Sequence, residues 1–420
     1  MWVTSMERSI RIAALSSWPW ALALPFCVGC ITGGGDRPER EGAWYATDLH
    51  IHTARGSNDS DQESTVSAYA ERAQTRGLDL IIFTDHSNST GSMDCESGDV
   101  EDCPNQGPEF PAQAAVAAVG ESGPHMAVGV EISPVASLEA TSEPTGHIGC
   151  IPRPGLALTA ETGFIEDRPA GSVTGGEGID WCEAAGGFSV LNHPHALAPW
   201  IAYDWSSMNY QAIEVFNGGA RFDVGDAAAV DTWMCDLAQG RAVVAVGGSD
   251  THRVHTPAPP ATVLDQALGF PITWVWSTDG SRDGLLAALQ AGRTIISDPD
   301  TSLNVVAWSD TATVGPGETI AGPVTIEVDG SVSVSGLQLQ VLTLSLGACV
   351  VDTRTENGAV PEVHPTVLFA QAMTPGESLH QELTVESSHA LLVRIWPTGD
   401  HAGFTDGVSL ASPIVILPSD

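Results

Sequence analysis

Residues 78–86 read LDLIIFTDH, an apolar run that ends in polar residues. The uninterrupted run at 80–83 is short, as expected for a strand that is buried on both faces. Gly77 precedes this run and supplies a natural stop for a helix that is predicted to begin near Ser64 and Thr65. A helix that leads into a buried strand predicts an α/β fold with a parallel sheet.

Four more short apolar runs also end at polar residues. The runs are residues 126–130, 188–191, 213–216 and 243–246, and they lead to Glu131, to Asn192 and His193, to Asn217 and to Asp250. In barrel enzymes the loops at the carboxyl ends of the strands converge on one rim, so we expect these polar residues to share a site. Helices are predicted at 227–239, which Gly240 closes, and at 283–290, between strands at 272–276 and 294–297.

The sequence changes character after residue 298, where we place a domain boundary. Residues 304–308, 324–328, 337–346, 366–369, 391–395 and 414–417 are β-rich and are separated by Gly, Pro and Ser turns. They predict a small all-β, sandwich-like domain over residues 299–420. Packing, substrate access and surface binding all remain open as its role. Residues 88–123 and 159–178 are expected to form long covering loops.

The first 30 residues resemble a targeting segment. Arg8 and Arg11 precede an apolar run at 12–28 that is too short and too interrupted for a membrane span but suits a secretory signal. The run ends in CVGC (27–30), a small residue before a cysteine, as in bacterial lipoprotein signals, and a linker follows at 31–43. We therefore expect a periplasmic or outer-membrane lipoprotein anchored through Cys30, or an extracellular protein if the signal is simply cleaved.

Export places the remaining cysteines where disulfides persist. They form an even set of Cys95, Cys103, Cys150, Cys182, Cys235 and Cys349. Cys95 and Cys103 flank a short acidic loop and could pair locally, whereas the other pairings cannot be derived from the sequence.

The chain is strongly acidic. It has 16 Lys and Arg residues against 52 Asp and Glu residues, a formal net charge of -36 and no lysine. Such a surface repels phosphate backbones and anionic lipids, so we expect no nucleic-acid partner. Solubility in a salty or extracellular setting explains the charge, and attraction of metal cations or cationic substrates is the alternative.

The histidines concentrate in the first two thirds of the chain, where nine of the 13 lie between His50 and His255. Most belong to four short polar segments, DLHIHT (48–53), TDH (84–86), NHPH (192–195) and GSDTH (248–252). Residues two apart in extended chain project to one face, so His50 and His52 can hold one cation together. Imidazole and carboxylate ligands suit zinc, iron or manganese. Each segment alone is common, but together, at strand ends, they predict a multi-metal site.

These four histidine segments occur together with VGVEIS (128–133), and a predicted helix separates DLHIHT from TDH. In this combination the sequence resembles the PHP (polymerase and histidinol phosphatase) metallohydrolase superfamily. IEVFN (213–217), ITWVW (272–276), LLAALQAGRTIIS (285–297) and the β-rich tail are most similar to its carbaryl-hydrolase type branch. The resemblance implies a distorted (β/α)7 barrel over residues 44–298, and it is weak for the tail.

The resemblance also implies three metal positions that hold two or three divalent ions, zinc, manganese or iron. The first would use His50, His52, Glu131 and Asp250, the second Glu131, His147 and His193, and the third His86, His252 and an acid from residues 57–61. Asp59 fits that acid best and Asp61 is second, although this loop lacks the family's usual serine-aspartate-glycine. An ordinary loop histidine is the alternative for His147. Glu131 would bridge two cations about 3.5–4 Å apart, as two-metal hydrolysis requires.

These residues predict hydrolysis of a small-molecule substrate by a metal-activated water. We assign catalysis to Glu131, His193 and Asp250, and substrate contacts to Arg55, His195, Asn217 and Arg253, each of which has a purely structural alternative. Asp48 and Asp85 orient ligand histidines or cap strand ends. A phosphoester is the expected substrate, and an ester, amide or carbamate is the alternative. The non-enzymatic alternative is an exported binding protein that keeps the metals as structure.

Overall fold

The computed structural model describes residues 37–54, 57, 60–86, 123–132, 146–156, 174–195, 209–218, 222–257, 265–351, 361–399 and 405–419, to which all structural statements below refer. The predicted signal segment with Cys30, and the residues Arg55, Asp59, Cys95 and Cys103, lie outside these ranges. Most of both predicted covering loops lies outside them as well.

The first helix, α1 (Val66–Arg76), lies where the sequence predicts it. The Thr65 side chain caps it by accepting from the backbone N–H of Ala68. Gly77 ends it in the left-handed conformation, with φ of 70°. The chain then enters β2 (Leu80–Phe83), which is buried throughout.

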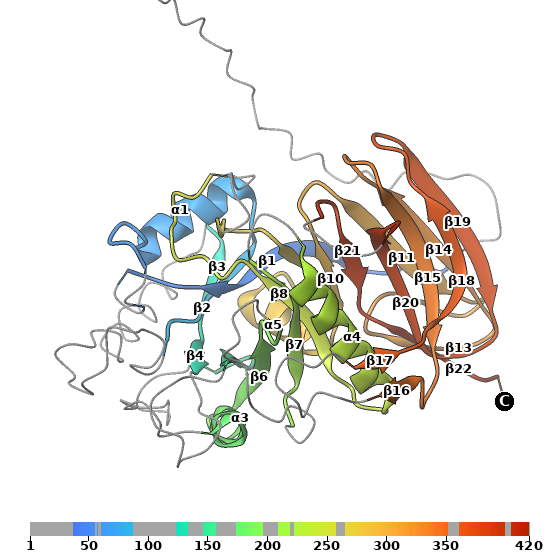
Figure 1. The fold of residues 1–420 in the computed structure, drawn as a ribbon, viewed down its shortest axis with the longest axis horizontal. Helices are drawn as coiled ribbons and strands as arrows, with labels where there is room; N and C mark the ends of the chain where they lie inside the picture. Colours follow the sequence, from blue (N-terminus) through green and yellow to red (C-terminus); the bar gives the residue numbers. More distant parts are fainter. Residues whose placement is uncertain are drawn as a thin grey trace, which may run out of the picture. The chain divides into compact units, whose positions relative to one another are not determined.

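Two sheets carry the first part of the chain (Figure 1). One is five-stranded, in the order β4 (Val130–Ile132), β5 (His147–Pro152), β6 (Gly187–Asn192), β7 (Ala212–Asn217) and β8 (Val244–Gly248). The other places β10 (Thr294–Ser297), β9 (Ile272–Ser277), β1 (Ala43–Ile51), β2 and β3 (His125–Val128) side by side. Helix α3 (Gly175–Ala184) contacts β5 and β6, α4 (Val224–Ala238) contacts β7, and α5 (Arg282–Gln290) contacts β9.

The expectation of a parallel sheet is wrong as a general statement, because both sheets are mixed. Strand pairs β1–β2, β2–β3, β6–β7 and β7–β8 are parallel. Pairs β4–β5, β5–β6, β1–β9 and β9–β10 are antiparallel. Antiparallel neighbours do not need the long crossover connection that parallel neighbours require, so helices are few.

Two isolated bridges join the two sheets. Ile51 pairs with Thr251 beyond β8, and His86 pairs with Glu131 of β4. The described strands thus form a mixed α/β arrangement, and no continuous ladder closing a seven-stranded barrel is present among them. Both bridges lie at the carboxyl ends of β1 and β2, where the histidine segments are.

The β-rich part contains more strands than the sequence predicts. They are β11 (Ser302–Trp308), β12 (Thr313–Val314), β13 (Thr319–Ala321), β14 (Val324–Ser331), β15 (Leu337–Leu344), β16 (Cys349–Val351), β17 (Glu362–Val363), β18 (Thr366–Ala372), β19 (Ser378–Val385), β20 (Ser388–Pro397), β21 (Ser409–Ala411) and β22 (Ile414–Leu417). Four of them form the sheet β12-β11-β14-β19, which shares one apolar core with β15, β20 and β22.

Residues 36–420 form one compact unit. The boundary predicted at residue 298 stays a prediction, and the first sheet runs across it because β10 pairs with β21 and β21 with β20. Helix α4 also contacts β15, β16 and β17, so it lies between the five-stranded sheet and the β-rich part (Figure 1).

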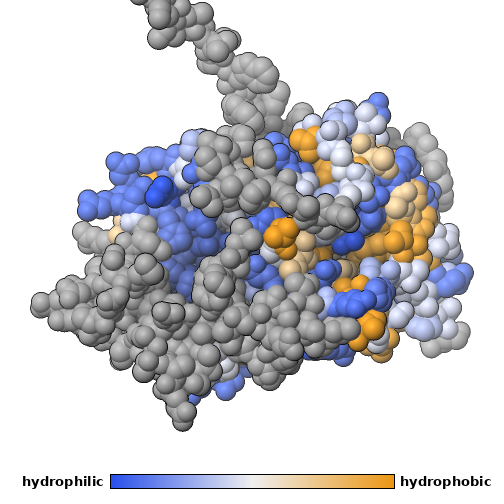
Figure 2. Space-filling view, viewed as in Figure 1, coloured by the Kyte–Doolittle hydropathy of each residue, from blue (hydrophilic) through white to orange (hydrophobic). Residues whose placement is uncertain are grey.

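Two disulfides are present, Cys150–Cys182 between β5 and α3, and Cys235–Cys349 between α4 and β16. No described helix is long and apolar enough to cross a membrane. Hydrophobic surface gathers where β15, β18 and β19 lie, whereas the surface around α1 is hydrophilic (Figure 2). Val367 and Leu368 of β18 contribute to the exposed apolar side chains.

Candidate metal centre

The histidine segments meet at the ends of β1, β2, β6 and β8. His50 is the second-last residue of β1 and His52 directly follows this strand, so the two side chains share a face. His86 follows β2, His193 follows β6, and Asp250 and His252 follow β8. Glu131 lies within β4 and His147 begins β5, so His147 is a strand residue and not a loop histidine.

Glu131 is the centre of the cluster. Its Oε1 lies 3.0 Å from His147 Nδ1, 3.1 Å from His50 Nε2 and 3.2 Å from His193 Nε2. Its Oε2 lies 3.1 Å from His86 Nδ1 and 3.5 Å from His52 Nε2. The carboxylate is fully buried, and five imidazoles surround it.

Asp250 is the second carboxylate. Its Oδ1 lies 3.1 Å from His52 Nε2 and 3.3 Å from His50 Nε2. Its backbone is left-handed, with φ of 51°. That conformation is unusual for a residue with a Cβ, and it turns the carboxylate toward the two histidines of the DLHIHT segment.

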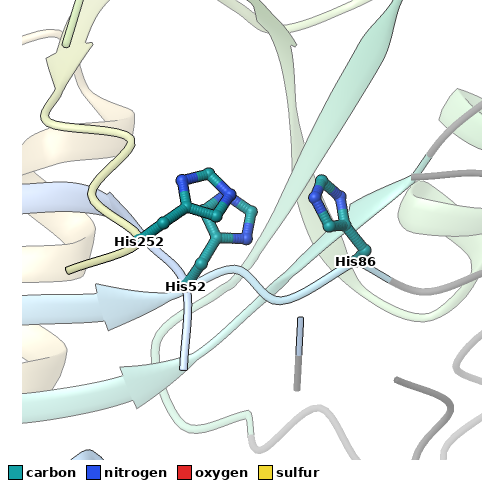
Figure 3. Close-up of side chains that lie close together, drawn as sticks. All are labelled: His52, His86 and His252. Atoms are coloured by element: carbon teal, nitrogen blue, oxygen red, sulfur yellow. The ribbon is translucent and has the colours of Figure 1, made fainter. Parts of the chain in front are cut away.

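Three histidines, His52, His86 and His252, form a further group (Figure 3). The rings of His52 and His252 stack with centroids 4.0 Å apart and planes 10° apart, and His86 lies across from them. The resemblance places His52 with His50 instead, and the structure allows both arrangements. Because a neutral imidazole has one nitrogen lone pair, His52 can bind only one cation at a time.

Five groups of three described side chains have donor atoms close enough to share a cation. Four belong to this cluster: His52, His86 and His252; His50, Glu131 and His193; His50, His52 and Asp250; and His86, Glu131 and His147. These four overlap, so they are alternative coordination sets and not four separate sites. The fifth, Glu327, Asp329 and His380, lies in the β-rich part.

Burial lowers the pKa of the histidines in the cluster, whereas nearby carboxylates raise it. Burial lowers the pKa of His52 to about 3 and of His147 to about 4, against the ordinary 6.5. Burial alone would also lower the pKa of His50, but Asp250, Glu131 and Glu214 together raise it well above 6.5. The surrounding histidines hold the pKa of Glu131 well below its usual value despite burial, so it is ionised.

The donor set fits divalent cations. Nε2 of His50, Nε2 of His52 and Oε2 of Glu131 are buried, and among the described residues they make no hydrogen bond. Buried polar atoms without hydrogen bonds are costly unless another partner, such as an ion, satisfies them. Mixed imidazole and carboxylate donors suit zinc, iron or manganese.

A second layer of polar contacts fixes the ligands. Glu214 Oε1 lies 3.1 Å from His50 Nδ1, and Glu214 Oε2 accepts from the backbone N–H of His193 at 2.9 Å. Gly248 has no side chain because a Cβ there would lie 2.5 Å from His50 Cβ. Carboxylate–histidine pairs of this kind set which ring nitrogen faces a metal.

The residues predicted to contact substrate have different positions. Asn217 donates to Glu214 Oε2 at 2.9 Å and lies 3.5 Å from Asp250 Oδ2, so it supports the rim of the cluster. His195 Nε2 lies 2.8 Å from Thr232 Oγ1 of α4, as its structural alternative requires. Arg253 is exposed next to His252. Arg55, like the proposed ligand Asp59, is outside the described residues.

Sequence reasoning missed two residues of the second layer. Ser57 Oγ lies 2.8 Å from His52 Nδ1, and Gln266 donates to Asp250 Oδ2 at 3.0 Å. Asn192, which the strand-end pattern predicts to lie at the site, donates to Glu131 Oε1 at 2.9 Å. Ser57 and Gln266 lie in irregular chain with no pattern that distinguishes them. Asp48 accepts from three backbone N–H groups, those of His50, Ser249 and Gly269, so it caps strand ends.

No protein-family model matches the chain, and neither does any curated protein. Among solved structures, one that is similar is a two-domain protein from Bacteroides vulgatus that is described as containing a predicted PHP-like metal-dependent phosphoesterase. It is 13% identical, with a TM-score of 0.39 over 91% of this chain and 100% of that one. Endonuclease Q from Pyrococcus furiosus is 15% identical, with a TM-score of 0.39 over 65% of this chain and 64% of that one.

A third similar structure is Endonuclease Q with a 27-mer duplex that carries an abasic lesion, at 14% identity and a TM-score of 0.38 over 59% of this chain and 57% of that one. These TM-scores leave the activity of this chain to be argued from its own site. Nothing in these structures supports the carbaryl-hydrolase branch.

The exclusion of nucleic acid as a partner is corrected. Two of the similar structures are an endonuclease, one of them with a DNA duplex at its active site. The physical reason is that a net charge summed over the chain does not describe the electrostatic potential at one site, because metal ions, where a site binds them, are often its largest local charges.

Proposed function

We propose that this chain is a metal-dependent phosphoesterase whose active site is the cluster around Glu131. The observation that carries the proposal is the convergence of six histidines and two carboxylates from separate strand ends on one buried point. A structural metal site closes its coordination with about four ligands, whereas this cluster offers donors for more than one ion.

Two or three divalent cations, zinc, manganese or iron, would supply a water of lowered pKa and Lewis-acid stabilisation of a phosphoryl oxygen. His50, His52, His86, His147, His193 and His252 would hold them together with Glu131 and Asp250. Glu131 can bridge because its two oxygens face different histidines, Oε1 toward His147 and Oε2 toward His86. Glu214 and Asn217 keep the rim in place.

The test combines metal analysis with turnover. Purified protein should contain at least two equivalents of transition metal by mass spectrometry and should hydrolyse aryl phosphate mono- or diesters. His50→Ala and Asp250→Ala should lose metal and at least 100-fold in kcat/KM, about 2.7 kcal/mol of transition-state stabilisation. His364→Ala is the control, because His364 is exposed and lies far along the chain in the β-rich part.

Two results would contradict the proposal. One is folded wild-type protein that takes up no metal from zinc, manganese or iron solutions. The other is turnover that His50→Ala leaves intact. The substrate panel also includes aryl esters, carbamates and an abasic DNA duplex. Activity on esters or carbamates with none on phosphoesters identifies a different hydrolase on the same site. Cleavage of the duplex with no turnover of aryl phosphates identifies a phosphoesterase that acts on DNA.

We also propose that the chain is exported, with Cys30 as lipid-bearing residue or with simple cleavage of the signal. The two disulfides support this, because such bonds persist mainly in oxidising compartments. Mass spectrometry of the mature amino terminus in a bacterial host distinguishes a diacylated cysteine, a cleaved chain and an unprocessed chain, and the last outcome contradicts export.

A further inference from the structure

We propose that Ser57 is a positioning residue that, held by Asp85, fixes the tautomer of His52 so that Nε2 faces the metal cluster. This inference rests on the proposed function, because it assigns to His52 a cation to bind. Ser57 acts through its contacts with His52 and with the backbone of His86, and no contact of Ser57 with a substrate is implied.

The Ser57 hydroxyl is completely buried and touches three groups. Its Oγ lies 2.8 Å from His52 Nδ1, 3.0 Å from Asp85 Oδ1 and 3.2 Å from the backbone nitrogen of His86. Ser57, His52 and Asp85 are each at most 1% exposed, so water does not compete for these contacts.

Asp85 acts only as an acceptor here. Besides Ser57, its carboxylate accepts from the backbone N–H of Thr53 at 2.5 Å and from Thr53 Oγ1 at 2.7 Å. A carboxylate with three donors is stabilised in its ionised form, which has no proton to give. The Ser57 hydroxyl must therefore donate its single proton to Asp85.

The two lone pairs of Ser57 Oγ remain for the other two contacts. The backbone N–H of His86 can only donate, and it takes one lone pair. The contact with His52 Nδ1 then requires Nδ1 to carry the proton. A neutral imidazole protonated at Nδ1 has its lone pair at Nε2, which faces Asp250 Oδ1 at 3.1 Å and Glu131 Oε2 at 3.5 Å.

His50 achieves the same orientation by a direct contact of Nδ1 with Glu214. For His52 a serine stands between the imidazole and the carboxylate. The serine also binds the backbone of His86, so one hydroxyl holds two candidate ligands, His52 and His86, from separate segments of the chain.

The direct test is the tautomer of His52 in the unaltered, zinc-loaded protein. Long-range nitrogen–proton spectra of protein labelled with 15N-histidine should show a slowly exchanging Nδ1–H for His52 besides that of His50, and the His52 signal is assigned by its loss in His52→Gln. A His52 with the proton at Nε2 would overturn the inference, and this measurement needs no Ser57 variant to fold.

The variants are Ser57→Ala, Ser57→Thr as the hydroxyl-keeping rescue, and Ser60→Ala as the control. Ser60 lies in the same loop, and its hydroxyl makes no hydrogen bond among the described residues. Ser57→Ala should weaken zinc binding about 10- to 100-fold in chelator competition and should remove the slowly exchanging Nδ1–H. Ser57→Thr should keep the Nδ1–H and lose less affinity than Ser57→Ala, and Ser60→Ala should match the wild type.

The inference fails if Ser57→Ala keeps both the Nδ1–H and zinc affinity within twofold of the wild type. That outcome would leave the proposed phosphoesterase activity intact. A wild-type protein that binds no metal contradicts the proposed function instead, and the tautomer of His52 in the metal-free protein then still decides the role of Ser57.

Discussion

His193 and Asp250 have positive φ values, 27° and 51°, the two such values among the described non-glycine residues. Left-handed backbone at a residue with a Cβ costs about 1–3 kcal/mol, and it persists where neighbours hold it. Glu214 accepts from the backbone N–H of His193, while Asn217 and Gln266 approach Asp250 Oδ2. Both residues with positive φ are candidate metal ligands. The polar contacts around them therefore hold the strained backbone that directs their side chains toward the cluster.

Glu214 should therefore affect metal affinity although it is not a candidate metal ligand. Glu214→Gln replaces one acceptor oxygen by a donating NH2 that must face either His50 Nδ1 or the His193 N–H, since both now point at a carboxylate oxygen. We expect zinc affinity to fall about 10- to 100-fold in chelator competition. The control is Glu41→Gln, which is exposed before β1. Equal affinity in the two variants would show that Glu214 does not orient the ligands.

At the residue scale, the sequence predicts the candidate metal ligands better than it predicts the residues that hydrogen-bond to those ligands. HxH spacing and strand-end polar residues are local patterns, and the eight described candidates do gather at one point. Ser57 and Gln266 act through contacts across the chain, such as Gln266 with Asp250, that no local pattern encodes. No local pattern marks Glu214 as a support either, because its contacts with His50 and His193 span 164 and 21 positions.

At the scale of single elements, local capping chemistry explains both agreement and error. Helix α1 agrees with its prediction because Thr65 and Gly77 are standard end signals. Helix α4 begins at Val224 and not at 227, because Asp223 and Asp226 form a reciprocal cap that adds a turn. Strand β19 was missed although Leu379 and Leu383 follow a period of two, since its polar residues resemble a turn. The expected strand at 126–130 divides at Gly129 into β3 and β4.

Gly77 offers a clean test of one such signal. A Cβ at Gly77 would meet nothing within 4 Å, so Gly77→Ala isolates the backbone cost of φ 70°. We expect the free energy of unfolding in urea to fall by about 1 kcal/mol. Gly176→Ala in α3 is the matched control, since space is also open there and φ is not positive, and it should stabilise by a few tenths to about 1 kcal/mol. Equal effects of the two changes would refute the left-handed cap.

Asp231 on α4 should make stability depend on pH. Burial raises the pKa of its carboxyl from 3.8 to about 6, against the opposing charge of Arg394. Between these values the folded state binds more protons than the unfolded state, so unfolding free energy falls as pH rises through this window. Compared with Asp231→Asn, the wild type should lose about 2 kcal/mol between pH 4 and 7 in urea titrations. Asp180→Asn, at an exposed site on α3, should parallel the wild type.

At the scale of the whole molecule, pairings between distant segments decide what the sequence alone could not. The boundary was placed where composition changes, yet β10 hydrogen-bonds to β21, more than 100 residues later. Composition reports which residues suit strands, whereas the order of strands in a sheet depends on long-range packing. The same holds for the cysteines, because their even number indicates disulfides whereas the sequence does not show which cysteines pair. In the structure one disulfide joins β5 of the five-stranded sheet to α3, and the other joins α4 to β16 of the β-rich part.

The two disulfides should differ in what they contribute to stability. Cys150–Cys182 closes a loop of 32 residues, and Cys235–Cys349 closes one of 114. Cross-links restrict the unfolded chain more when the loop is longer, and the logarithmic dependence predicts that the second bond stabilises by about 1 kcal/mol more. The test compares the double variants Cys150→Ala/Cys182→Ala and Cys235→Ala/Cys349→Ala by urea unfolding without reductant. Each variant lacks one disulfide and two sulfur atoms, so the change in composition is the same in both. A larger loss for the shorter loop would mean that local packing of β5 on α3 outweighs the constraint on the unfolded chain.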